Sequence, residues 1–98
     1  MTRFLEAYEE QGVDIWGLTG GNEPSAGIFP NYDWQCMFFS SGLQRDFIKL
    51  DLGPTLQERD HQDVKILILD DQRFLLPDWA NTVGLFFVFF IRISHVRF

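Results

Sequence analysis

The chain has 98 residues, of which 46% are hydrophobic and 22% are charged, so it can form one small globular domain and is not a disordered chain. Its net charge of −6 argues against nucleic-acid binding, because there is no basic stripe to neutralise phosphates. The single cysteine, Cys36, cannot form an intramolecular disulfide, and we expect its thiol to be a small buried group.

A helix and a strand are predicted at the beginning of the chain. Apolar residues recur at helical spacing over about residues 3–11, where Thr2 can cap the helix and Gly12 can end it. The β-branched and aromatic run Val13–Thr19 follows directly and predicts a strand. Such a short link between helix and strand is typical of α/β units.

A long connection over residues 20–40 follows this strand. Its Gly, Pro and aromatic residues suit a solvated linker poorly, so we expect it to fold over another part of the protein. It opens with Gly20-Gly21-Asn22-Glu23-Pro24, which puts a carboxylic acid just past the end of a strand. Loops at the C-terminal ends of parallel strands carry the chemistry of α/β proteins. An Asn-Glu-Pro sequence there is typical of the proton-donating carboxyl of a glycosidase.

The next helix is predicted to begin at Ser41, because Ser41-Gly42-Leu43-Gln44 has the form of a capping box. Gly53-Pro54 should break or kink this helix and leave a short further turn to Glu58. Its buried side is expected to carry Leu43, Phe47, Ile48 and Leu50.

A second strand and a third helix complete the predicted order. Val64–Leu69 is a nearly continuous apolar run, as expected of a parallel strand covered on both faces, and a helix should follow from about Leu76-Pro77 to Asn81. The order helix-strand-helix-strand-helix predicts an α/β fold with a parallel sheet and a right-handed crossover. Consequently we expect Asn22-Glu23 and Asp70-Asp71-Gln72-Arg73 at the same edge of the sheet.

Several other polar and aromatic residues have structural interpretations. Asp70 or Asp71 as a nucleophile facing Glu23 is one alternative, but a network is favoured in which one aspartate caps the following helix and the other pairs with Arg73. The isolated histidines, His61 and His95, indicate no metal site. The tryptophans expected to be packing residues are Trp16 and Trp79.

Three blocks of the sequence carry a family likeness. Trp16–Gly27 resembles the acid/base segment of the lysosomal acid β-glucosidases, the glucosylceramidases. Gln44–Leu56 resembles the following barrel helix of that family, and Leu69–Ala80 resembles its next strand end and helix. The blocks keep the family order, and the likeness runs from about Phe4 to Ala80.

The resemblance implies a fold and a set of site residues. The fold is a (β/α)8 TIM barrel with an accessory β domain, of which the two predicted strands would be the fourth and fifth. Glu23 matches the general acid/base of a retaining mechanism, and Asn22 matches the residue that binds the sugar 2-hydroxyl. Tyr32 matches a family tyrosine at the mouth of the cleft, Trp34 replaces another aromatic of the family, and Gln72 is expected to bind substrate. For Tyr32 and Trp34, packing or loop-anchoring roles are the alternative. No cofactor is implied, and the nucleophile would belong to the seventh strand, which this chain does not reach.

The resemblance also implies partners and a compartment. The substrate would be glucosylceramide or another β-glucoside, and the full-length enzyme would contact a lipid surface or an activator protein. A lysosomal location is expected from the family, although the amphipathic segment Met1–Glu6 is no signal peptide, so the protein is cytosolic or its true N-terminus is missing.

The end of the sequence departs from the family pattern. Residues 1–80 are expected to form part of the catalytic barrel and residues 81–98 a divergent, Phe-rich tail, which suggests an intron read-through, a frameshift or a truncated gene model. The apolar run Val83–Ile91 is too short to cross roughly 30 Å of hydrocarbon, but it is an aggregation hazard. The isolated chain is therefore expected to be inactive. The alternatives are a non-catalytic remnant or truncated isoform, and a small carbohydrate-binding α/β module.

Overall fold

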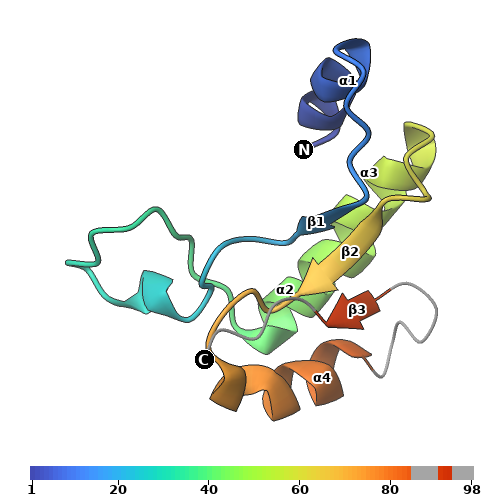
Figure 1. The fold of residues 1–98 in the computed structure, drawn as a ribbon. Helices are drawn as coiled ribbons and strands as arrows, with labels where there is room; N and C mark the ends of the chain where they lie inside the picture. Colours follow the sequence, from blue (N-terminus) through green and yellow to red (C-terminus); the bar gives the residue numbers. More distant parts are fainter. Residues whose placement is uncertain (85–90, 94–98) are drawn as a thin grey trace.

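The computed structural model describes residues 1–84 and 91–93, and within them a parallel sheet carries helices on one side (Figure 1). The strands pair in the order β1-β2-β3, and both pairings are parallel. The strands are β1 (Gly17–Thr19), β2 (Lys65–Ile68) and β3 (Ile91–Ile93). The helices are α1 (Thr2–Glu10), α2 (Ser41–Phe47), α3 (Gly53–Glu58) and α4 (Leu76–Gly84), with short turns η1 (Ala26–Ile28), η2 (Ile48–Leu52) and η3 (Arg73–Leu75).

The first helix is confirmed, while its cap and the length of the first strand differ from expectation. Thr2 lies inside α1 and caps nothing, whereas Gly12 follows the helix with φ +78°, as predicted for the residue that ends it. Only the last three residues of the predicted strand pair with β2. Residues before Gly17 have no ladder partner because β2 begins at Lys65, whose N–H donates to the Trp16 carbonyl at 2.9 Å.

The crossover between β1 and β2 stays helical from Ser41 to Glu58, so the helix does not stop at Gly53-Pro54, but its α-helical form is interrupted before Gly53 and the further segment ends at Glu58, as predicted. A π-helical turn, η2, precedes Pro54, which occupies the first turn of α3, where a missing N–H costs no helical bond. The cap is displaced by one residue, since the Ser40 hydroxyl, and not Ser41, accepts from the Leu43 N–H at 3.1 Å.

The buried side of the crossover differs from the predicted one. Leu43 and Leu50 are exposed, contrary to expectation, and Phe47 is half-buried. Ile48 is buried as predicted, and the side chains buried with it follow at intervals of four residues. The crossover residues in the core are Ile48, Leu52 and Leu56.

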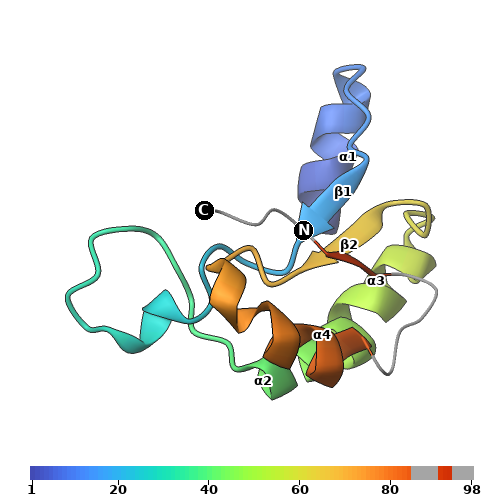
Figure 2. The same ribbon diagram turned by 60° about the horizontal axis from the view of Figure 1, so that its bottom comes forward.

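The two faces of the sheet are covered unequally. Helices α2, α3 and α4 gather on one side, as the two views in Figures 1 and 2 show, and Ile66 and Ile68 of β2 are buried there. Lys65 and Leu67, which alternate with them, are only half-buried. The expectation of a strand covered on both faces is therefore wrong for the described residues. Trp16, expected to pack, is also exposed.

The third predicted helix is confirmed and extends to Gly84 as α4, with Trp79 and Val83 buried in the core. The predicted apolar run falls partly on residues 85–90, which lie outside the described residues. Ile91–Ile93 pairs with Ile66–Ile68 as β3. Within the described ranges, no helix is both long enough and apolar enough to cross a membrane.

Candidate functional site

Glu23 lies at the edge of the sheet where β1 and β2 end. Its N–H donates a 3.0 Å hydrogen bond to the Asp70 carbonyl, which confirms that the loops after the two strands meet. Glu23 is outside any helix, has φ +40° and is 9% exposed. A positive φ is unusual for a residue other than glycine and is found where surrounding contacts fix the backbone. The carboxyl is thus presented from a fixed backbone position at the strand ends.

Asp71 ties the same two loops together with its side chain. One carboxylate oxygen accepts from the Ser25 N–H at 2.9 Å and from the Ser25 hydroxyl at 2.6 Å, and the other accepts from the Gln72 N–H at 2.7 Å. The predicted helix cap is wrong, because η3 has no side-chain cap. Asp71 is 2% exposed, and its three donors engage both oxygens. This arrangement is structural and leaves Asp71 poorly placed to act as a nucleophile.

The Gln44 side chain, on α2, is hydrogen-bonded to the end of β2. Its fully buried Oε1 accepts from the Leu69 N–H at 3.0 Å and from the Trp79 indole N–H at 2.8 Å. Leu69 and Asp70 have φ values of +74° and +53°, so the backbone turns sharply immediately above this contact. The capping-box pattern assigned Gln44 to a helix terminus, and no local sequence signal reveals that it bonds to residues 25 and 35 positions away.

Tyr32 is the predicted cleft residue that contacts Glu23. Its hydroxyl donates a hydrogen bond to the Glu23 Oε2. This bond to a carboxylate raises the pKa of Tyr32 to about 12, because ionising the phenol would remove the donor and place a second negative charge beside the first. The bond places a phenol donor directly on the Glu23 carboxyl.

The other predicted substrate-binding residues are Asn22 and Trp34 on the long loop and Gln72 after β2. The Asn22 side-chain amide donates to the Gln35 carbonyl at 3.2 Å, which ties the start of the long loop to its return segment. Trp34 is 74% exposed, and Gln72 is also exposed. All three side chains are exposed, and none belongs to the core.

The long loop forms an arm, residues 28–38, that projects away from the sheet (Figures 1 and 2). The expectation that its aromatic residues fold over another part of the protein is met only just beyond the arm, where Phe39 packs on Phe47 at a ring-centre distance of 5.6 Å. Cys36, expected to be buried, is half-buried. The exposed apolar residues of the arm are Ile28, Phe29, Trp34, Met37 and Phe38.

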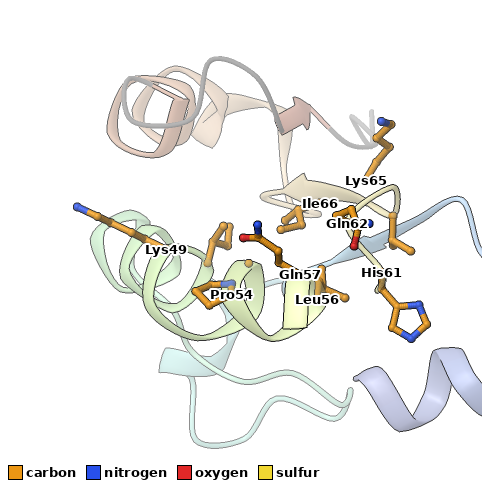
Figure 3. A pocket seen from close by; sticks show the side chains of 11 residues that line it. Lys49, Pro54, Leu56, Gln57, His61, Gln62, Lys65 and Ile66 are labelled. Carbon is orange, nitrogen blue, oxygen red and sulfur yellow. The ribbon is translucent and has the colours of Figure 1, made fainter. Parts of the chain in front are cut away.

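A pocket of about 480 Å³ lies between α3 and the beginning of β2, and none of the predicted site residues lines it (Figure 3). His61 borders this pocket but points toward α1, where its two ring nitrogens lie 3.8 Å from a Glu6 oxygen and 3.5 Å from a Glu9 oxygen. His61 lies in the polar connection between α3 and β2, yet it is only 5% exposed. In residues 1–84 and 91–93, no group of three or more His, Cys, Asp or Glu residues could hold a metal ion.

Known proteins resemble this chain in sequence and in fold. The model of the glycosyl hydrolase family 30 TIM-barrel domain matches residues 1–85. Lysosomal acid glucosylceramidase of Mus musculus is 53% identical over 81 residues, which cover 83% of this chain and 16% of that protein. An endo-beta1,6-glucanase structure superimposes with a TM-score of 0.66 over 89% of this chain and 18% of its own, at 23% identity, which shows the shared fold alone. The chain belongs to glycosyl hydrolase family 30 and spans part of its TIM-barrel domain.

Proposed function

We propose that this chain supplies the general acid/base carboxyl, Glu23, of a retaining glycoside hydrolase that cleaves β-glucosides such as glucosylceramide. The observation that carries the proposal is the placement of Glu23 where two parallel strands end, with its N–H on the Asp70 carbonyl and its carboxyl on the Tyr32 hydroxyl. In TIM barrels the catalytic groups come from this end of the strands.

The proposed chemistry has two steps. In the first, Glu23 gives its proton to the leaving glycosidic oxygen while a second carboxylate, about 5–5.5 Å away, attacks the anomeric carbon. In the second, the Glu23 carboxylate removes a proton from water, which hydrolyses the glucosyl-enzyme. Tyr32 donates to the carboxylate that exists between the two steps and so stabilises it.

We assign the nucleophile to a part of the barrel outside these residues, since Asp71 already receives three hydrogen bonds. In this assignment β1 and β2 are the fourth and fifth barrel strands, residues 1–80 belong to the barrel, and residues 81–98 are a divergent tail. The isolated 98-residue chain is then inactive.

The remaining site residues are assigned to substrate binding. Asn22 would exchange the Gln35 carbonyl for the sugar 2-hydroxyl, while Tyr32, Trp34 and Gln72 would border the cleft. We assign contact with a lipid surface or an activator protein to the full-length enzyme, and we assign a lysosomal location because the similar mouse protein is named as lysosomal. The reaction requires no cofactor.

A second candidate is a non-catalytic remnant or truncated isoform. The half-exposed face of β2 favours it, because a barrel interior without its other strands leaves apolar side chains unburied. The third candidate is a small carbohydrate-binding module. For such a module we expect cooperative thermal unfolding, with a midpoint temperature that rises when glucose or a β-glucoside is added. Precipitation or a broad transition indifferent to sugar favours the remnant.

A chimeric enzyme tests the proposed function. The segment of the mouse glucosylceramidase that matches this chain is replaced by the matching residues of this chain, and hydrolysis of octyl β-glucoside is measured. We expect activity in the chimera and a loss of roughly 10²–10⁴-fold in its Glu23→Gln variant. A folded chimera whose activity is indifferent to Glu23→Gln would contradict the proposal.

A further inference from the structure

We propose that Asp71 is a positioning residue that holds Glu23 in the orientation needed to protonate the leaving oxygen. The inference rests on the proposed function of Glu23. Asp71 reaches Ser25, two residues beyond Glu23, and it does so from the loop after the neighbouring strand. Its carboxylate is therefore a cross-link between the two strand-end loops.

The burial of Asp71 makes its hydrogen bonds to the Glu23 loop necessary. A carboxylate that is 2% exposed has lost almost all contact with water, so its charge must be satisfied by donors of the protein. Asp71 receives three such donors, two of them from Ser25. Charge-assisted hydrogen bonds are short and strong, and the 2.6 Å separation between the Ser25 and Asp71 oxygens has that character.

Glu23 is fixed on both sides by this arrangement. On its N-terminal side, its own N–H is bonded to the Asp70 carbonyl at 3.0 Å. On its C-terminal side, Pro24 is followed by Ser25, which Asp71 holds by both backbone and side chain. The positive φ of Glu23 lies between these two attachments, so its side-chain direction depends on both of them.

The loop that carries Asp71 is itself anchored to the core. Gln44 accepts from the Leu69 N–H and from the Trp79 indole, which links the end of β2 to α2 and α4. Asp71 therefore ties the Glu23 loop to a framework that is itself fixed by packing, namely the end of β2 with α2 and α4. Removing its charge should leave that framework intact and release the loop, because Gln44 and Trp79 do not contact Asp71 in any of these hydrogen bonds.

The test compares two substrates of the chimeric enzyme. Departure of an alkoxide from octyl β-glucoside needs a proton, whereas departure of 2,4-dinitrophenolate does not, and kcat/KM reports the step in which the leaving group departs. We expect Asp71→Asn to lower kcat/KM for octyl β-glucoside by roughly 10–100-fold, as a misplaced catalytic group does, and to leave the dinitrophenyl substrate within about threefold. An equal loss on both substrates would overturn the inference and assign Asp71 to folding alone.

Two further variants keep the test decisive. Ser25→Ala removes only the hydroxyl contact and should give the same selective loss, smaller in size, even where Asp71→Asn fails to fold; an equal loss on both substrates there also overturns the inference. Asp63→Asn, an exposed aspartate before β2, is the matched control and should change neither substrate. If Glu23→Ala shows no selective loss on octyl β-glucoside, the proposed function fails. If Glu23→Ala shows the selective loss but the Asp71 and Ser25 variants do not, only this inference fails.

Discussion

The packed body of the chain and its projecting arm are held together by different means. In the body, α2–α4 and β2 share a buried apolar core, and Gln44 and Asp71 satisfy the backbone groups at the strand ends. In the arm, residues 28–38, large apolar side chains are exposed, and Tyr32 reaches back to Glu23. Glu23 lies at the junction. The body can therefore fix the backbone of Glu23. The arm instead brings side chains such as Tyr32 to Glu23, and these side chains are not buried in this chain.

The largest expected effect comes from the same substitution made in the two regions. Ile48 is 1% exposed in the body and Ile28 is 65% exposed in the arm. Because a buried isoleucine loses both transfer free energy and packing contacts, Ile48→Ala should lower the free energy of unfolding by about 2–5 kcal/mol. Ile28→Ala should change it by less than about 0.5 kcal/mol. Urea denaturation of the chain measures both, and equal effects would remove the distinction between body and arm.

A smaller effect is expected where the arm returns to the body. A Cβ at Gly27 would lie 2.3 Å from the Phe38 backbone nitrogen, so one of the two segments has to move. Gly27→Ala should cost about 1–3 kcal/mol, as overpacking does. The expected sign reverses in α2, where a Cβ at Gly42 meets only the Ser40 hydroxyl at 3.9 Å, and Gly42→Ala should stabilise by about 0.4–1 kcal/mol. Finding Gly27→Ala as well tolerated as Gly42→Ala would show that η1 and Phe38 are not in contact.

The smallest effect concerns the contact between the arm and Glu23. The pKa of Tyr32 is raised to about 12, above the value of roughly 10 for an unfolded chain. Because the pKa of Tyr32 rises on folding, the hydrogen bond from Tyr32 to Glu23 adds to the free energy of unfolding. This contribution is fully present below pH 10 and is lost as the pH rises through about 12. Tyrosinate absorbance after a rapid pH jump reads this titration, and Tyr32→Phe identifies the signal. Glu23→Gln should return the midpoint of the Tyr32 titration toward 10. A midpoint already near 10 in the unsubstituted chain would show that Tyr32 does not donate to Glu23.

The sequence predicted the order of elements from α1 to α4 and the meeting of the two strand ends, but it did not predict β3. Strand-end geometry alone requires residues after β1 and β2 to share one edge, and the Glu23 N–H to Asp70 bond confirms it. The roles of Asp71 and Gln44 could not be predicted in this way. Their partners are 46, 25 and 35 positions distant, and such pairings arise only when the chain is packed.

The π-helical turn was equally hidden in the sequence. The sequence pattern assigns Leu43 and Leu50 to the buried side together with Ile48, whereas the residues buried with Ile48 are Leu52 and Leu56, four and eight positions later. Gly53 follows the π-helical turn, and a Cβ there would lie 2.9 Å from the Ile48 carbonyl oxygen. A residue-by-residue periodicity cannot anticipate a change of helical pitch that the packing imposes.

Chemical rescue of Glu23→Ala in the chimeric enzyme tests the central claim most directly. Azide is small enough to enter the space left by the carboxyl and needs no general base to attack the glucosyl-enzyme. With dinitrophenyl β-glucoside as substrate, we predict that azide restores turnover and yields β-glucosyl azide, identified by the configuration of its anomeric carbon in NMR spectra. A folded Glu23→Ala enzyme that gains no rate from azide, or that still hydrolyses octyl β-glucoside at the rate of the unsubstituted chimera, would contradict the assignment of Glu23 as the acid/base.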